Sequence, residues 1–271
     1  MGLGGQMVMW EDEFCLELAG RGYWVIRFDN RDVGRSTILR EAPIPSRLQL
    51  MLRDRSGAAY SLSDMAHDAA GLLDHLGLSS AHVVGVSMGG MIAQRLAIDD
   101  PARLLSLVSI MSSTGNRRVG RIHPTMLPRF FKRPRVDHDG YVTDFVETFN
   151  AIGSRRYPPG EERLRALAER CYERGVHPAG TSRQLAAVVT AGDRTDGLRR
   201  VAVPSTVIHG DADRLVMPSG GQATAEAIPG ARLVMIPGMA HDLPPVLWGQ
   251  IVEEIVMCAQ AAADRTPEES R

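Results

Sequence analysis

The chain has 271 residues, of which 44% are hydrophobic and 23% charged, and this composition excludes a wholly disordered protein. A formal net charge of −1 gives no sign of a nucleic-acid partner, and three distant cysteines argue against a disulfide framework or a structural zinc site. No apolar run reaches the roughly 18 residues of a membrane span and no signal peptide is evident, so we expect a cytoplasmic protein without a membrane span.

Short β-branched runs alternate with longer segments of helical periodicity, which predicts an α/β fold with a mostly parallel sheet and crossover helices. The expected strands are Tyr23–Asp29, Ala81–Val86, Leu104–Met111, Ser205–His209 and Arg232–Ile236. The expected helices are Glu11–Gly20, Ser63–Leu76 with Ser63 as N-cap, Met88–Ile98 and Pro245–Ala262. The polar tail at residues 264–271 is expected to be flexible.

Strand-like runs are absent between residues 112 and 198, where arginine, proline and helix-forming residues dominate. We therefore expect a helical cap at 112–198, inserted into a core made of residues 1–111 and 199–263. A basic cluster from Arg117 to Arg135 has two interpretations: it attracts anions or membrane headgroups, or it is only a solvated face. Solvated faces are the more common of the two.

The sequence Gly85-Val86-Ser87-Met88-Gly89 fits the Gly-x-Ser-x-Gly elbow of serine hydrolases. An expected strand precedes it and an expected helix follows, which is the context the motif requires. The sharp turn strains the serine backbone, so close neighbours must lack side chains. Ser87 is therefore the expected nucleophile; the alternative is a glycine-flanked serine that caps a helix.

A nucleophilic serine needs a base, and the base needs an orienting acid, in the usual chain order Ser, Asp or Glu, His. Beyond the expected cap only His209 and His241 remain, and His241 follows the last strand in a glycine-bearing loop, whereas His209 ends a strand. Asp213 is preferred as the acid. Asp211 is expected to form a turn, and Asp242 is too close in sequence to His241 to orient its ring easily.

Acyl transfer also needs backbone N–H donors for the developing oxyanion. One is the N–H of Met88, directly after Ser87. The second is expected from the early loop Gly2-Leu3-Gly4-Gly5, which makes Leu3 the donor. The alternative is that these glycines are an unstructured start of the chain or a cloning remnant.

In combination these motifs resemble the α/β-hydrolase superfamily, and within it the carboxylesterase and aclacinomycin methylesterase-like group. The resemblance rests on Gly2–Gly5, Arg27–Ser36, Val84–Gly90, Gly210–Asp213 and Pro237–Pro244. It implies an α/β-hydrolase fold with a helical cap, and an ester hydrolase without cofactor or metal. It also implies a triad of Ser87, Asp213 and His241, an oxyanion hole of Leu3 and Met88, and a structural turn at Asp29–Ser36 whose charged residues pair with each other.

The chain departs from this family at its start. Family members carry two or three strands before the oxyanion loop, whereas this sequence begins at that loop. A sheet without a central strand would leave its neighbours without ladder partners. Three explanations compete: a misassigned start codon, a deliberate truncation, or a sheet that closes up on the remaining strands.

The leading hypothesis is hydrolysis of a small or medium apolar carboxylic ester through an acyl-enzyme. The alternatives are cofactor-free perhydrolysis or carbon–carbon bond hydrolysis on the same residues, or a catalytically impaired hydrolase, because one fold serves several chemistries. The expected partner is a small-molecule ester, and no pattern sets the oligomeric state. Cap aromatic residues would either line an apolar pocket or form the core of the cap, the second being more common: Phe130, Phe131, Tyr141, Phe145, Phe149 and Tyr157.

Overall fold

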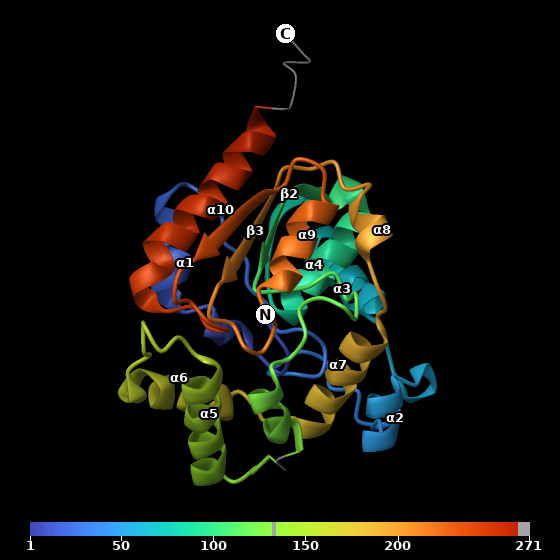
Figure 1. Cartoon of the computed structure of the whole chain (residues 1–271), viewed down its shortest axis with the longest axis vertical. Helices are drawn as coiled ribbons and strands as arrows, with labels where there is room; N and C mark the ends of the chain where they lie inside the picture. Colours follow the sequence, from blue (N-terminus) through green and yellow to red (C-terminus); the bar gives the residue numbers. More distant parts are fainter. Residues whose placement is uncertain (132–133, 265–271) are drawn as a thin grey trace.

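A computed structural model describes residues 1–131 and 134–264 and contains one parallel sheet (Figure 1). Its four strands are β1 (Ala81–Val86), β2 (Leu104–Ile110), β3 (Ser205–Gly210) and β4 (Arg232–Ile236). They lie in the order β1-β2-β3-β4, with each neighbouring pair parallel. The predicted α/β class and these four strands are confirmed.

The register of the sheet brings the carboxyl ends of its strands to one edge. Val86 of β1 lies opposite Ile110 of β2, and Gly210 of β3 lies opposite Ile236 of β4. Because ligands bind beyond the carboxyl ends of parallel strands, the loops that follow β1, β3 and β4 are the ones able to build a shared site.

The predicted strand at Tyr23–Asp29 is wrong. Within the described residues this segment has no ladder partner, and β1 pairs with β2 alone. Its β-branched and aromatic side chains favour a strand, but a strand exists only where a neighbour pairs with its backbone. The segment stays beside β1, where the rings of Tyr23 and His82 are 5.9 Å apart, and it leaves Trp24 71% exposed.

Helices cover both faces of the sheet (Figure 1). On one face, α1 (Asp12–Gly20) and α10 (Trp248–Ala263) share a hydrophobic cluster with the strands. The opposite cluster involves five helices: α3 (Leu62–His75), α4 (Met88–Asp99), α7 (Pro178–Thr190), α8 (Thr195–Leu198) and α9 (Ser219–Ala227). The sheet is therefore the middle of three layers.

The start of α3 differs from its prediction. Ser61, not Ser63, is the N-cap: its hydroxyl accepts a hydrogen bond from the backbone N–H of Asp64, and the Asp64 carboxylate accepts one from the N–H of Ser61. This reciprocal capping box satisfies two backbone donors at once, which a cap at Ser63 would not do.

The C-terminal helix begins as a 3-10 turn, η5 (Pro245–Leu247), and continues as α10. Pro245–Ala263 is long and apolar enough to cross a membrane by length and composition, although Glu253 and Glu254 interrupt its apolar run. Its apolar face, including Ile251 and Ile255, is buried in the core beside the sheet. This packing is that of a core helix of a globular fold. The expected flexible tail lies outside the described residues after Asp264.

Between β2 and β3 the chain is helical in its described part. It forms η4 (Pro124–Phe131), α5 (His138–Ile152), α6 (Glu161–Glu173) and α7 (Pro178–Thr190) before α8. Figure 1 shows α5, α6 and α7 gathered beyond the carboxyl edge of the sheet, whereas α8 lies beside α4 and α9. The division of the chain into a core and a cap at 112–198 remains our proposal. Because α8 packs against the core helices α4 and α9, it favours a cap that ends before α8.

The remaining short elements precede α3 or follow α4. They are η1 (Met7–Met9), α2 (Arg47–Leu52), η2 (Arg55–Gly57) and η3 (Pro101–Arg103).

The turn after residue 28 is tied to the helices between β2 and β3 by ion pairs. Asp32 accepts two hydrogen bonds from Arg183 of α7, at 2.8 and 2.7 Å, and both side chains are buried. Asp29 pairs with Arg174, and Arg31 with Asp68 of α3. The expectation that charged residues of this turn pair with each other is wrong, because their partners lie on α3, on α7 and just after α6.

We expect Arg183→Met to destabilise the fold by about 3 to 5 kcal/mol at pH 7, because it leaves the Asp32 carboxylate buried without a counter-charge. Burial alone would raise the pKa of Asp32, but hydrogen bonds from Arg183 and Leu39 outweigh it and hold the pKa below its usual value. Asp32 is therefore ionised at pH 7, and the stability it gains from the pair is lost only as the pH falls through its lowered pKa.

Urea unfolding at pH 7 measures this effect. The double variant Asp32→Asn/Arg183→Met is the control, because it removes the charge along with its partner. Equal stability of the single variant and the wild type would contradict the role of the pair.

Candidate active site

Ser87 occupies the turn between β1 and α4 in a strained conformation, with φ 55° and ψ −117°. The neighbouring glycines are required by space: a Cβ on Gly85 would lie 2.2 Å from the carbonyl oxygen of Gly89, and one on Gly90 would lie 2.7 Å from Cβ of Ser112. Such strain costs about 1 to 3 kcal/mol and is typical of functional sites. The structure thus places Ser87 in the tight turn predicted by the motif.

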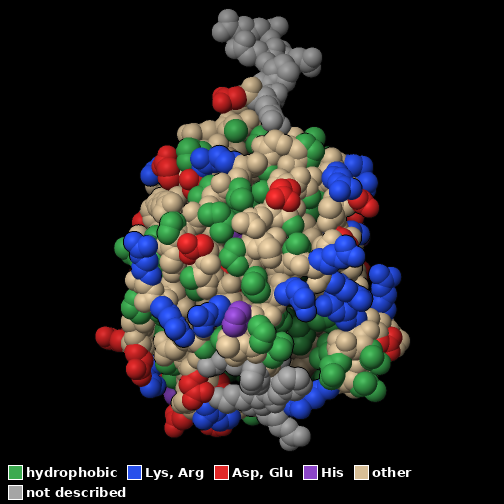
Figure 2. All heavy atoms as spheres, in the orientation of Figure 1, with side chains coloured by type: hydrophobic (Ala, Val, Ile, Leu, Met, Phe, Trp, Pro, Cys, Tyr) green, Lys and Arg blue, Asp and Glu red, His purple; other side chains and the backbone are tan. Residues whose placement is uncertain are grey.

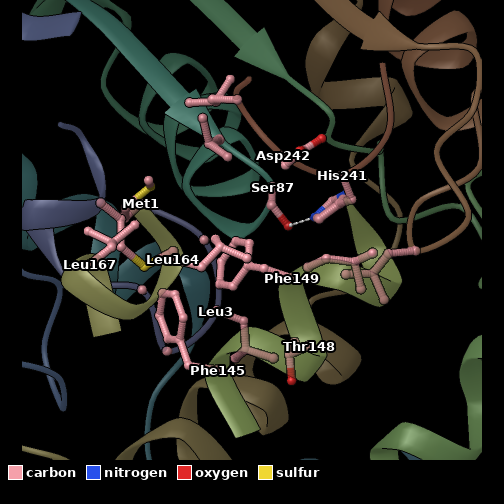
Figure 3. Close-up of a pocket in the computed structure, with 18 of the residues that line it drawn as sticks. Met1, Leu3, Ser87, Phe145, Thr148, Phe149, Leu164, Leu167, His241 and Asp242 are labelled. Atoms are coloured by element: carbon pink, nitrogen blue, oxygen red, sulfur yellow. Dashed lines mark hydrogen bonds between the residues drawn. The ribbon is translucent and has the colours of Figure 1, made fainter. Parts of the chain in front are cut away.

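A chain of hydrogen bonds joins the three residues expected to act together. The Nε2 atom of His241 is 3.0 Å from Oγ of Ser87 (Figure 3), and its Nδ1 atom is 2.7 Å from Oδ2 of Asp213. Ser87 follows β1, Asp213 follows β3 and His241 follows β4. The parallel sheet therefore brings together residues that are up to 154 positions apart.

The carboxylate of Asp213 is held rigidly in its loop. Its Oδ1 atom accepts hydrogen bonds from the backbone N–H groups of Leu215 (2.8 Å) and Val216 (2.9 Å), which leaves Oδ2 for His241. Burial favours the neutral acid, but the charge of His241 and hydrogen bonds from His209 and His241 outweigh it, so the pKa of Asp213 lies well below its usual value. Asp213 is therefore an anion throughout the neutral range.

The competing residues lie nearby in other roles. His209 is fully buried, and its Nε2–H donates to the carbonyl oxygen of Val216 at 2.8 Å while lying 3.5 Å from Oδ2 of Asp213. Asp211 accepts a hydrogen bond from the N–H of Gly238 at 2.6 Å, which ties the two loops together. Neither residue contacts Ser87 through a hydrogen bond in the described part of the chain.

Of the two expected oxyanion donors, Leu3 borders the space in front of Ser87, whereas Met88 is buried at the start of α4 directly after Ser87. Gly2 lies against Ser87, since a Cβ on Gly2 would be 3.3 Å from Cβ of Ser87, and Leu3 lines the cavity in front of it (Figure 3). Among described residues, no protein acceptor takes the backbone N–H of Leu3 or Met88. Their role as oxyanion donors stays a prediction.

A cavity of about 460 Å³ opens in front of Ser87 and His241. Most of its wall is apolar: Tyr141, Phe145 and Phe149 come from α5, and Leu164 and Leu167 from α6 (Figure 3). Three of the six aromatic residues proposed for a pocket thus line it. Tyr157 packs against the core cluster instead and donates to the carbonyl oxygen of Pro237. The side chains of Phe130 and Phe131 lie outside the described residues.

Ser154, just after α5, holds the histidine loop and was missed by the sequence analysis. Its hydroxyl donates to Asp242 and accepts from the N–H of Ala240 at 2.8 Å, and its own N–H donates to Oδ1 of Asp242 at 3.0 Å. His241 also donates its N–H to the carbonyl oxygen of Ile152 at 3.0 Å. No local motif predicts these contacts, because they join residues 86 to 89 positions apart.

The second carboxylate oxygen of Asp242, Oδ2, is buried and has no hydrogen-bond partner among the described residues. Burial is the largest effect on it and raises its pKa, against the hydrogen bonds from Ser154. Asp242 is thus an anchor of the histidine loop rather than the acid that orients the ring, as its adjacency to His241 implied. Among the residues described, no group of three or more His, Cys, Asp or Glu side chains could hold a metal ion.

Comparison with known proteins identifies the family of the chain. The family described as alpha/beta hydrolase fold matches residues 1–245. The chain belongs to this family. The hydrolase is similar to rhodomycin D methylesterase DnrP of Streptomyces peucetius, with 28% identity over 93% of this chain and 87% of the relative. It is also similar to a non-heme haloperoxidase of Rhodococcus erythropolis, with 26% identity over 86% of this chain and 80% of that protein.

Among solved structures, the hydrolase is similar to the crystal structure of a hydrolase from Pseudomonas aeruginosa. The two have 26% sequence identity and a TM-score of 0.68, and the match covers 96% of this chain and 87% of the other. The suspected superfamily, the α/β-hydrolase fold and the enzyme class of hydrolase are therefore confirmed.

We expect Ser154→Ala to slow the reaction of Ser87 with a fluorophosphonate by about tenfold. The change leaves the buried N–H of Ala240 and the Asp242 carboxylate short of a partner, which loosens the loop that carries His241. Labelling rates per folded molecule, followed by intact-protein mass spectrometry, measure the effect.

Ser182→Ala is the matched control, because that hydroxyl donates to Pro178 within α7 and does not contact the histidine loop. Wild-type labelling by Ser154→Ala would show that the loop holds His241 without this serine.

Proposed function

We propose that the protein hydrolyses carboxylic esters of small or medium apolar substrates through an acyl-enzyme. One observation carries the proposal: a hydrogen-bonded series of Asp213, His241 and Ser87 ends on a strained serine at the mouth of an apolar cavity. A serine becomes nucleophilic only beside such an oriented base. The apolar wall favours apolar groups on the ester.

In the first half of the reaction, His241 Nε2 takes the proton from Ser87 Oγ as Oγ bonds to the ester carbonyl carbon. Asp213 accepts the hydrogen bond from Nδ1–H of His241, so Nε2 is the unprotonated ring nitrogen before the reaction begins. The same carboxylate stabilises the imidazolium that forms when Nε2 takes the proton. The imidazolium then gives its proton to the leaving alkoxide as the carbon–oxygen bond breaks. An alcohol leaves and an acyl-Ser87 ester remains.

In the second half, His241 takes a proton from water, whose oxygen attacks the acyl carbon. The tetrahedral intermediate collapses, Ser87 Oγ regains the proton from His241, and the carboxylic acid departs. In both halves we expect the backbone N–H groups of Met88 and Leu3 to donate hydrogen bonds to the negative oxygen of the tetrahedral intermediate. Loss of one oxyanion donor typically costs about 100- to 1000-fold in kcat.

The relatives support the ester as substrate class. The similar Streptomyces peucetius protein is named a rhodomycin D methylesterase, and its match covers 93% of this chain. The haloperoxidase relative supports a second candidate, perhydrolysis, in which hydrogen peroxide replaces water in the attack on the acyl-enzyme. Carbon–carbon bond hydrolysis remains an alternative on the same three residues, with no separate feature of the site in its favour.

We expect Ser87→Ala to abolish hydrolysis of short-chain p-nitrophenyl esters and to abolish fluorophosphonate labelling, because Ser87 Oγ is the atom that forms the acyl-enzyme. Ser112→Ala is the control, since Ser112 donates to the carbonyl oxygen of Ser87 but is not the proposed nucleophile. Ester turnover retained by Ser87→Ala would refute the mechanism.

The same esters, supplied with and without hydrogen peroxide, separate the two candidate reactions. Peracid formed faster than carboxylic acid would favour perhydrolysis. A folded wild-type protein without turnover on any ester would support the catalytically impaired alternative.

We expect Phe149→Ala to lower kcat/KM about five- to thirtyfold for a p-nitrophenyl hexanoate and much less for the acetate. The ring lines the cavity and stacks near Phe145 with a centroid distance of 4.6 Å, so its loss removes apolar contact that only a longer acyl group reaches. The acetate is the internal control. Equal losses on both esters would contradict the assignment of this wall to the acyl chain.

A further inference from the structure

A second concave surface lies where η2, the loop at residues 115–118 and the end of α7 meet. It encloses about 410 Å³ and is lined by four exposed arginines, Arg53, Arg55, Arg117 and Arg118. No residue that lines it also lines the cavity in front of Ser87. We call this surface the arginine cleft.

The positive charge of the arginine cleft is not balanced by nearby carboxylates. Asp193 is the one acidic residue in its wall, and its oxygens already accept hydrogen bonds from Asn116 and Thr195. Within residues 1–131 and 134–264, none of the four guanidinium groups has an ion-pair partner. The pKa of Arg53 is lowered mainly by burial and in smaller part by the charge of Arg117, which lies in the same wall.

The backbone at Arg53 directs two of these arginines to the same place. Arg53 ends α2 in the left-handed region, with φ 53° and ψ 42°, where glycine is the usual residue. Its N–H donates to the carbonyl oxygens of Gln49 and Leu50, and the chain then turns into η2, which carries Arg55. A non-glycine residue at this position costs backbone strain.

The outer face of α2 is apolar and exposed. Leu48, Met51 and Leu52, spaced three and four positions apart on one face, are 64%, 71% and 70% exposed. Figure 2 shows hydrophobic side chains over α2 directly beside a gathering of Lys and Arg side chains. Single exposed leucines are ordinary, but a contiguous apolar patch marks an interaction surface.

We propose that the exposed face of α2 and the arginine cleft bind the surface of a bilayer that contains anionic phospholipid. The lipid phosphates accept hydrogen bonds from the guanidinium groups, and Leu48, Met51 and Leu52 enter the interfacial layer. A basic surface beside an exposed apolar helix face is the combination that such an interface attracts. A free phosphate or a nucleic acid would use the arginines alone and leave the leucines in water. This inference is independent of the proposed ester hydrolysis.

Vesicle co-sedimentation tests the proposal with the full chain. We expect the protein to bind vesicles of phosphatidylcholine and phosphatidylserine at low salt, to release them as salt is raised, and to bind phosphatidylcholine vesicles far less. Arg117→Gln/Arg118→Gln should weaken binding roughly thirtyfold, because each basic residue near an anionic surface contributes about fivefold. Leu48→Ser/Leu52→Ser should weaken it about tenfold.

Matched variants on the opposite side of the molecule control for charge and polarity. Arg21→Gln/Arg165→Gln removes the same charge from the end of α1 and from α6. Leu16→Ser/Val246→Ser makes equally exposed apolar residues polar. Both should bind vesicles as the wild type does. All four variants should keep the wild-type rate on a soluble ester and the wild-type melting temperature, which shows that the fold is intact.

Three outcomes would overturn the proposal. The first is no binding to anionic vesicles at low salt. The second is binding that Leu48→Ser/Leu52→Ser leaves unchanged while inorganic pyrophosphate competes fully for the arginines, which would make the cleft a small-anion site. The third is binding to double-stranded DNA as tight as to vesicles at the same ionic strength.

Discussion

The parallel register of β1, β3 and β4 is the constraint on which the rest of the site depends. Each strand ends at the same edge of the sheet, and each is followed by one member of the series Ser87, Asp213 and His241. A hydrogen bond of 3.0 Å between Ser87 and His241 tolerates little displacement, so the packing that holds the sheet also sets this distance. Helices on both faces bury the sheet and thereby hold its edge in place.

The helices beyond that edge are joined to the turn at Asp29–Ser36 and to the loop that carries His241 by buried polar contacts, not by apolar packing alone. Arg183 of α7 pairs with Asp32, Arg174 pairs with Asp29, and Ser154 binds the loop that carries His241. Such contacts are directional, so they set the position of α5 and α7 relative to Ser87. The wall of the cavity and the orientation of the base are consequently linked through Ser154, which belongs to the same segment as the cavity-lining residues Phe145 and Phe149.

Local patterns predicted the four strands and the helices α1, α3, α4 and α10, because apolar periodicity reflects which face is buried. For the segment that holds α5, α6 and α7 they gave only a general helical character. They failed where a partner distant in sequence decides the outcome. Tyr23–Asp29 has the composition of a strand but no neighbour to pair with in the described structure. The N-cap of α3 is a separate case: Ser61 caps the helix through a local capping box with Asp64, a sequence signal that the choice of Ser63 overlooked. The charged turn at Asp29–Ser36 found its partners on α3, α7 and the residues after α6.

By itself, the sequence determined the fold class, the four strands and the candidate residues Ser87, Asp213 and His241, because an elbow motif and loops after predicted strands are visible in chain order. Only the tertiary structure decided that Asp213 rather than Asp211 faces His241, that Ser154 holds the histidine loop, and that Tyr141, Phe145 and Phe149 line the cavity while Tyr157 does not. These outcomes depend on distances between segments far apart in the chain. Neither periodicity nor motif spacing carries that information, because both describe only neighbours along the sequence.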